Sequence, residues 1–131
     1  MNGAGAKLAE PGKLCINIMG DAPIGMTGMD VETAARNRIA ILTIVFNNGV
    51  MAAERDVAPL STSKYGAPTV SGNCAKVAEG LNVASMRIAK PGDIVPAVKD
   101  AVRVTETGAP FLLEIMVKEG YDFSRYELAG L

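Results

Sequence analysis

The amino-acid sequence predicts a three-layer α/β/α fold, in which a parallel sheet of about four strands lies between helices. Short apolar segments alternate with segments of helical character along the 131 residues, and such alternation is typical of parallel sheets. Two of the apolar segments, 13–19 and 40–46, show little polar alternation, which indicates strands that are buried on both faces. Hydrophobic residues make up 49% of the chain, which is enough for one compact core.

The first half of the chain predicts two helices and two strands. Residues 5–10 have the character of final helical turns, because a Pro-Gly pair follows directly. The strand at 13–19 comes next. The segment 27–37 begins with Thr-Gly-Met-Asp, the spacing of a capping box, and its alanines favour a helix. Residues 40–46 are rich in Ile, Leu and Val and form the second strand.

The second half predicts two more helix–strand pairs after a long connection. The segment 49–72 has no periodicity and holds several Pro, Ser and Gly residues; a connection of that length is usually functional or mobile. A helix is expected over 73–81 and a strand over 84–89. Residues 93–106 repeat Ile, Ala and Val at helical spacing, and 111–117 form the fourth strand.

Composition excludes several classes of function. The formal net charge of −1 provides no basic surface for nucleic acid or for an acidic membrane. Aromatic residues are 5% of the chain and Trp is absent, so base stacking is not indicated either. No apolar segment approaches the ~18–20 residues that span a bilayer. The first residues lack the apolar core of a secretory signal, so we expect a cytoplasmic protein.

The residues that usually perform catalysis are sparse. His is absent, which removes the commonest general base. Cys15 and Cys74 lie far apart and match no metal-ligand spacing. We expect Cys15 to be a reduced thiol inside a buried strand. Any chemistry must therefore come from a cofactor or from a partner chain.

Two polar residues follow the first two strands, at the points where those strands end. Asp21 comes after the strand at 13–19, and Asn48 comes after the strand at 40–46. Parallel neighbouring strands bring their carboxyl ends together, and ligands bind at that edge of open α/β sheets. A carboxylate and an amide oxygen in proximity suit a hard cation such as Mg²⁺. Taken singly, either residue would be read as part of an ordinary strand-end turn.

The order of residues around these two positions resembles a known family. Gly20-Asp21-Ala22, then the helix segment Asp30–Arg36, then Asn47-Asn48 is similar to the thiamine-diphosphate motif, which runs from Gly-Asp-Gly to Asn-Asn. In the acetolactate-synthase-like branch, the helix between them often reads Glu-Leu-x-Thr-Ala-x-Arg. The similarity extends from about Ala4 to Lys118. The chain thus resembles the C-terminal, diphosphate-binding domain of these enzymes, truncated at its N-terminus.

The resemblance implies thiamine diphosphate and Mg²⁺ as cofactors. The implied Mg²⁺ ligands are Asp21, Asn48 and the main-chain carbonyl oxygen of Val50, with diphosphate oxygens and a water completing the shell. Met51 would lie near the thiazolium ring, although a methionine also commonly fills gaps in a core. The cofactor-binding residues are then Gly20, Asp21, Ala22, Pro23, Asn48, Val50 and Met51.

The chain departs from the family pattern at two positions. Ala22 replaces the last glycine of the motif, which is a mild change. Pro23 has no N–H to offer the diphosphate. We therefore expect weaker phosphate contacts, or contacts rerouted through Ile24 or Gly25. The charged residues at 54–56 are expected to form a solvated loop edge.

The resemblance also implies a partner. Family enzymes bind the cofactor between two domains from different subunits, and this sequence resembles only one of them. The pyrimidine-binding domain, whose glutamate drives cofactor activation, would belong to another chain or to an upstream region. We therefore expect a single partial domain over residues 1–131, with 118–131 as a polar tail, which is inactive alone and part of a homo-oligomer of the full enzyme. The family topology implies the strand order 1-2-4-3, with the first strand as an exposed apolar edge.

The leading functional hypothesis is the Mg²⁺-dependent thiamine-diphosphate-binding portion of a 2-oxo acid decarboxylase or carboligase. A non-catalytic binding or assembly module that kept the fold is the alternative, and Pro23 speaks for it. An unrelated flavodoxin-like or nucleotide-binding domain would need a phosphate loop or Gly-x-Gly-x-x-Gly after the first strand, and the sequence has neither.

Overall fold

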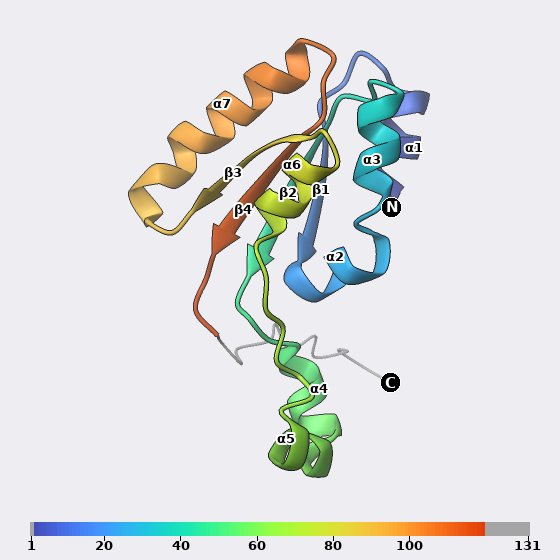
Figure 1. The fold of residues 1–131 in the computed structure, drawn as a ribbon. Helices are drawn as coiled ribbons and strands as arrows, with labels where there is room; N and C mark the ends of the chain where they lie inside the picture. The colour runs from blue at the N-terminus through green and yellow to red at the C-terminus, as the bar shows by residue number, and fades with distance from the viewer. Residues whose placement is uncertain (1, 120–131) are drawn as a thin grey trace, which may run out of the picture.

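The computed structural model describes residues 2–119, which form a parallel α/β fold (Figure 1). The strands are β1 (Cys15–Gly20), β2 (Ile41–Asn47), β3 (Ala84–Ile88) and β4 (Phe111–Met116). They form one sheet in the order β1-β2-β4-β3, and every neighbouring pair is parallel. The helices are α1 (Asn2–Ala9), α2 (Asp21–Thr27), α3 (Asp30–Arg36), α4 (Ala52–Val57), α5 (Pro59–Tyr65), α6 (Cys74–Gly80) and α7 (Ile94–Glu106), with a 3₁₀ turn at Pro91–Asp93. The fold class and strand order expected from the sequence are confirmed.

Helices cover the two faces of the sheet (Figure 1). The neighbouring residues Leu112 and Leu113 on β4 are both fully buried, because successive side chains of a strand point to opposite faces. Leu113 packs in one cluster with Ala97 of α7. Leu112 packs on the other face with Val31 of α3 and Ala78 of α6. The three-layer arrangement follows from this division, since each face of the sheet must bury its apolar side chains.

β2 and β4 lie in the centre of the sheet and are almost entirely buried, as the sequence predicts for β2. The prediction that the first strand is buried on both faces is wrong. β1 is an edge strand, and Ile16 and Ile18 are 46% and 62% exposed. Both belong to the face that α7 covers, because they pair in register with Leu42 and Ile44. Cys15 is likewise only partly buried. The cause is position: α7 lies over the other strands and leaves β1 open.

The helix predicted at 27–37 is present as α3 (Asp30–Arg36), but it starts three residues later than expected, and the capping box at its start is wrong. Helix α2 begins at Asp21, immediately after β1, and Thr27 is its last residue. The Thr27 hydroxyl donates to the Pro23 carbonyl oxygen at 3.4 Å instead of capping the next helix. Helix α3 starts after Met29 without a side-chain cap. Pro23 is compatible with the first turn of α2, where a missing N–H leaves no helical hydrogen bond unmade.

The segment 49–72, predicted to be without regular structure, contains the short helices α4 and α5. Pro59 occupies the start of α5, and Gly66 ends it in the left-handed conformation at φ 60°. The segment leaves and rejoins the sheet through an antiparallel neck, where the Val70 N–H donates to the Gly49 carbonyl at 2.9 Å. The two helices therefore project beyond the carboxyl edge of the sheet (Figure 1). Within the tail predicted at 118–131, residues 120–131 lie outside the described part of the chain.

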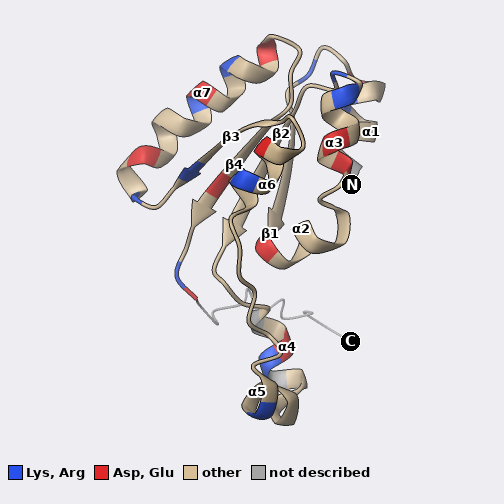
Figure 2. Cartoon of the chain, viewed as in Figure 1, with Lys and Arg blue, Asp and Glu red and all other residues tan. Residues whose placement is uncertain are grey.

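Charged residues of both signs are interspersed along the outer helices, as in α7 (Figure 2). This distribution agrees with the net charge of −1. Among the described residues, no helix has the length and apolar character to cross a bilayer.

Candidate functional site

The ends of β1 and β2 meet at the carboxyl edge of the sheet, as the sequence predicts. Gly20 and Phe46 are partners in the β1–β2 register, so the residues that follow each strand emerge side by side. Asp21 is buried at the first position of α2. The Gly49 N–H donates to Asp21 Oδ2 at 2.8 Å, which ties the two strand ends together directly.

Both oxygens of the Asp21 carboxylate accept backbone hydrogen bonds. Oδ1 accepts from the Ala22 N–H at 2.9 Å, and Oδ2 accepts from the Gly49 N–H. Hydrogen bonds to a carboxylate are stronger than neutral ones, so they hold this group in one orientation. Each oxygen keeps a further lone pair, which leaves capacity to bind a cation.

Asn48 forms a tight turn at the end of β2. Its Oδ1 accepts from the Val50 N–H at 3.0 Å, the pattern of an Asx turn. Between them, Gly49 has φ 75°, a left-handed conformation that favours glycine. The turn curls the chain so that Asn48 and Val50 border the same hollow as Asp21.

A cavity of about 360 Å³ lies at this edge, and we call it the carboxyl-edge pocket. All of the cofactor-binding residues expected from the sequence line it: Gly20, Asp21, Ala22, Pro23, Asn48, Val50 and Met51. The structure thus brings these positions together, while their binding of a cofactor stays a prediction. The pocket also contains residues that the sequence did not single out, namely Met26, Phe46, Ala53 and Val117, and it includes Glu54, which was expected only at a solvated edge.

The chemistry of the lining fits Mg²⁺ with a diphosphate. The described residues contain no cluster of three or more His, Cys, Asp and Glu side chains that could enclose a metal ion. The pocket instead combines one buried carboxylate with neutral amide and carbonyl oxygens. Mg²⁺ commonly takes one or two protein carboxylates and completes its shell with phosphate oxygens and water. The residues present suit an ion that arrives with its phosphate ligand.

Glycine at position 20 is not required by the fold itself. A Cβ atom there would lie 3.5 Å from Pro23 Cδ, an ordinary contact, and its φ of −85° suits any residue. The absence of a side chain at Gly20 therefore leaves space in the carboxyl-edge pocket, which Gly20 lines.

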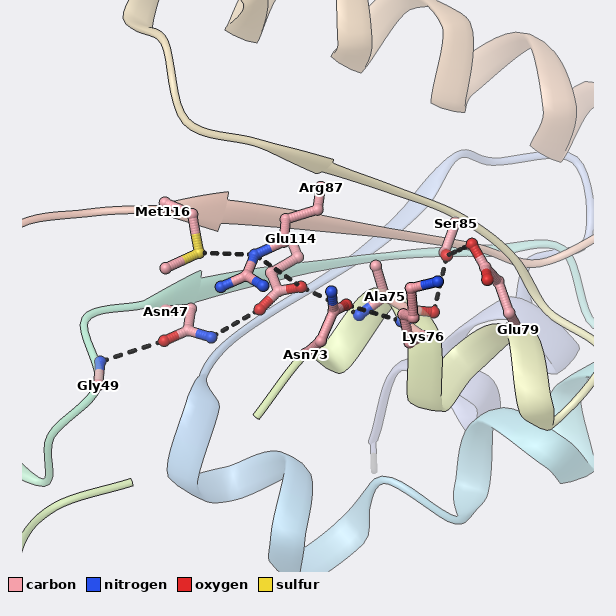
Figure 3. A network of polar contacts seen from close by, with 10 residues as sticks. All are labelled: Asn47, Gly49, Asn73, Ala75, Lys76, Glu79, Ser85, Arg87, Glu114 and Met116. Carbon is pink, nitrogen blue, oxygen red and sulfur yellow. Dashed lines mark hydrogen bonds and ion pairs between the residues drawn. The ribbon is translucent and has the colours of Figure 1, made fainter. Parts of the chain in front are cut away.

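A buried polar network behind the pocket was missed by the sequence analysis (Figure 3). Glu114, in the middle of β4, is 0% exposed. Its Oε1 accepts from Asn47 Nδ2 at 2.6 Å, and its Oε2 accepts from the Ala75 N–H at 3.1 Å. Arg87 Nε on β3 lies 3.6 Å from Oε2. The signal was a single acidic residue inside the otherwise apolar run Phe-Leu-Leu-Glu-Ile-Met.

Cys74 stands at the first turn of α6 beside this network. Burial, followed by the negative charges of Glu114 and Asp21, raises the pKa of the Cys74 thiol to about 11. The thiol is therefore protonated near neutral pH and is a poor nucleophile.

A larger hollow of about 680 Å³ lies at the opposite edge of the sheet, around Lys7, Arg38 and Thr105. It contains none of the residues that follow β1 and β2, and open parallel sheets bind ligands at the carboxyl edge. The smaller carboxyl-edge pocket is therefore the candidate site.

Comparisons with known proteins show what this chain is similar to. The family model for the thiamine pyrophosphate enzyme, C-terminal TPP binding domain, matches residues 2–115. The acetolactate synthase catalytic subunit of Aspergillus candidus is 31% identical over 114 residues, which are 86% of this chain and 16% of that protein. The mitochondrial acetolactate synthase of Schizosaccharomyces pombe is 27% identical over 117 residues, 88% of this chain and 17% of that protein.

A solved structure shares the fold. The thiamine diphosphate-dependent 4-hydroxybenzoylformate decarboxylase of Rhodococcus jostii RHA1 superposes with a TM-score of 0.73 at 24% identity. The superposition covers 90% of this chain and 22% of the decarboxylase chain. The present sequence thus spans about a fifth or less of the length of these proteins.

Proposed function

This chain belongs to the family of thiamine pyrophosphate enzymes, as their C-terminal cofactor-binding domain, and we propose that its carboxyl-edge pocket holds the diphosphate of thiamine diphosphate through Mg²⁺. The observation that carries the proposal is the buried Asp21 carboxylate, tied to the end of the neighbouring strand by the Gly49 N–H. It places an anionic oxygen beside the neutral oxygens that follow β2, in a pocket at the ligand-binding edge of a parallel sheet.

Each residue of the pocket has a defined part in the proposal. Asp21 provides the charged ligand to Mg²⁺, while Asn48 Oδ1 and the main-chain carbonyl of Val50 provide neutral ones. Gly20 leaves room for the diphosphate, and Met51 contributes an apolar contact to the thiazolium ring. Thiamine diphosphate, when bound, supplies a carbanion that cleaves or forms carbon–carbon bonds next to a carbonyl group.

Pro23 weakens the hold on the phosphates in this proposal. It lies in the first turn of α2 and lines the pocket, but it has no N–H to donate. The phosphate contacts are therefore fewer than a residue with an N–H would provide, or they pass through Ile24 or Gly25.

The full activity we propose is that of a 2-oxo acid decarboxylase or carboligase, which the names of the relatives support. It requires a pyrimidine-binding domain from another chain or region, because activation of the aminopyrimidine needs a carboxylate that, by the family resemblance, belongs to that domain. His is also absent as a substitute base. A homo-oligomer and a cytoplasmic location stay predictions.

Isothermal titration calorimetry of the 131-residue chain tests the binding step. Thiamine diphosphate should bind in the presence of Mg²⁺ and lose its binding on addition of a chelator. Asp21→Ala should abolish detectable binding, because it removes the charged ligand. Asn48→Ala should weaken binding about tenfold, or ~1.4 kcal/mol, because a neutral ligand contributes less.

Glu106→Gln is the matched control, since it removes an exposed carboxylate at the end of α7, away from the carboxyl-edge pocket. Thiamine diphosphate binding that neither the chelator nor Asp21→Ala weakens would contradict the proposal and favour the non-catalytic module. Steady release of carbon dioxide from a 2-oxo acid by this chain alone would contradict the need for a second domain.

A further inference from the structure

Glu114 has no part in the cofactor contacts just described, yet it is fully buried and stands one hydrogen bond behind the pocket (Figure 3). We propose that Glu114 is a positioning residue, which sets the orientation of Asp21 and of the turn at 47–50 through the side chain of Asn47. The inference rests on the proposed function where cofactor affinity is concerned, but its structural part concerns this chain by itself.

A continuous line of hydrogen bonds runs from Glu114 to Asp21. Glu114 Oε1 accepts from Asn47 Nδ2 at 2.6 Å. Asn47 Oδ1 accepts from the Gly49 N–H at 3.1 Å, and the same N–H donates to Asp21 Oδ2 at 2.8 Å. The Gly49 N–H thus donates a bifurcated hydrogen bond to the side chains of Asn47 and Asp21. The line joins β4, β2 and the first residue of α2.

The carboxylate selects one of the two possible orientations of the Asn47 amide. An ionised carboxylate only accepts hydrogen bonds, so the NH₂ group of Asn47 must face it. The amide oxygen then points to the Gly49 N–H. In the flipped amide, an NH₂ group would face that N–H, and two donors would oppose each other. The charge of Glu114 therefore determines that the Asn47 amide oxygen, and not its NH₂ group, faces the Gly49 N–H in the turn at 47–50.

Glu114 itself is held from its other side. Its Oε2 accepts from the Ala75 N–H at the start of α6 and faces Arg87 Nε on β3. Buried charges persist in proteins when they are paired and hydrogen-bonded, as this one is. Since the Ala75 N–H and the central strand β4 hold the carboxylate, Asn47 has a rigid partner, and rigid support of ligating groups is what a binding site requires.

Glu114→Gln is the informative substitution, because it keeps the shape of the side chain while adding a donor. The glutamine amide can present either its oxygen or its NH₂ to Asn47, so the orientation of Asn47 is no longer selected. Arg87→Met is the matched control. It removes the ion pair with Glu114 and keeps an apolar stem, but it leaves the Asn47 hydrogen bond in place.

Amide exchange and the chemical shift of the Gly49 N–H, measured by NMR on the cofactor-free chain, report the orientation directly. In Glu114→Gln the Gly49 amide should exchange about tenfold faster than in the unsubstituted chain and change its shift, while amides within β2 keep their protection. Mg²⁺-dependent affinity for thiamine diphosphate should fall about tenfold. Arg87→Met should lower the urea midpoint without changing either signal of Gly49.

Asn47→Ala serves as a second variant, and its test does not depend on Glu114→Gln folding. It should release the Gly49 amide in the same way while Glu114 keeps its contacts with Ala75 and Arg87. An unchanged Gly49 signal in a folded Glu114→Gln or Asn47→Ala chain would overturn the inference, as would equal effects of Arg87→Met. Should the unsubstituted chain not bind thiamine diphosphate, the proposed function fails, and the Gly49 signal alone still decides this inference.

Discussion

Cys74 shows how the buried charges of the site act on a single residue. The thiol is 7% exposed at the start of α6, and burial is the largest cause of its raised pKa. Glu114 and Asp21 add to the rise because a negative thiolate would face two carboxylates, and Arg87 opposes it. The folded chain therefore binds the thiol proton more tightly than an unfolded chain does.

The stability of the chain should fall as the pH rises from about 9 to about 11, because of this thiol. Above pH 9 the unfolded thiol loses its proton while the folded one keeps it, so the unfolded state binds fewer protons and is favoured by rising pH. The loss should approach about 2 kcal/mol. Urea unfolding of the reduced chain at intervals from pH 8 to 11 measures it. Cys74→Ala should decline less steeply, and parallel curves for the two chains would contradict the assignment.

At the scale of elements, the short helices depend on local signals at their ends. Helix α6 is seven residues long and begins with Asn73, whose Oδ1 accepts from the Lys76 N–H at 2.9 Å. The same helix presents the Ala75 N–H to Glu114. The first turn of α6 is therefore capped by Asn73 and also donates a hydrogen bond to the buried network. Correct placement of α6 supports the Glu114 carboxylate behind the pocket.

Asn73→Ala should destabilise the chain by about 1 kcal/mol, because it removes the hydrogen bond that satisfies the Lys76 N–H at the helix start. Asn73→Ser should retain most of the stability, since serine also caps helices. Thermal or urea unfolding of the three chains provides the comparison. If Asn73→Ser were as unstable as Asn73→Ala, the effect would belong to packing around residue 73 and not to the cap.

At the scale of the whole molecule, the open edge of the sheet at β1 exposes apolar side chains. β1 is the edge of the sheet, and it carries Ile16 and Ile18 on the face that α7 covers elsewhere but leaves open at β1. Phe46, the register partner of Gly20 at the end of β2, is also exposed on this face. An apolar edge strand offers both unpaired backbone groups and hydrophobic contact to another chain.

The 131-residue chain in isolation should therefore associate with itself in a concentration-dependent way, and Ile18→Lys should reduce that association. A lysine at an edge strand opposes pairing with a second edge. Val95→Lys on α7 is a matched control, because Val95 has the same exposure as Ile18, 62%, and lies away from the edge. Sedimentation velocity over a range of concentrations measures the effect. Equal behaviour of the two variants would place the association elsewhere.

The sequence by itself determined the elements whose signals are local. Four apolar runs and two periodic segments predicted the strands and the helices α6 and α7, because periodicity depends only on neighbours along the chain. The ordered motif around Asp21 and Asn48 indicated where the pocket forms, and the structure brings those residues to one edge. Helix α2 was missed because Gly20-Asp21-Ala22 was interpreted as a strand-end turn, and α4 and α5 were missed because the segment 49–72 shows no helical periodicity.

Only the tertiary structure decided how much of each strand is covered by helices and what lies behind the pocket. β1 and β2 have similar apolar sequences, and their different burial comes from the place of each in the sheet and from the reach of α7. Glu114 and Asn47 are 67 residues apart, and their contact exists because β4 inserts beside β2. No local pattern encodes such a pairing, because the hydrogen bond depends on the assembled sheet and on the helix start that completes it.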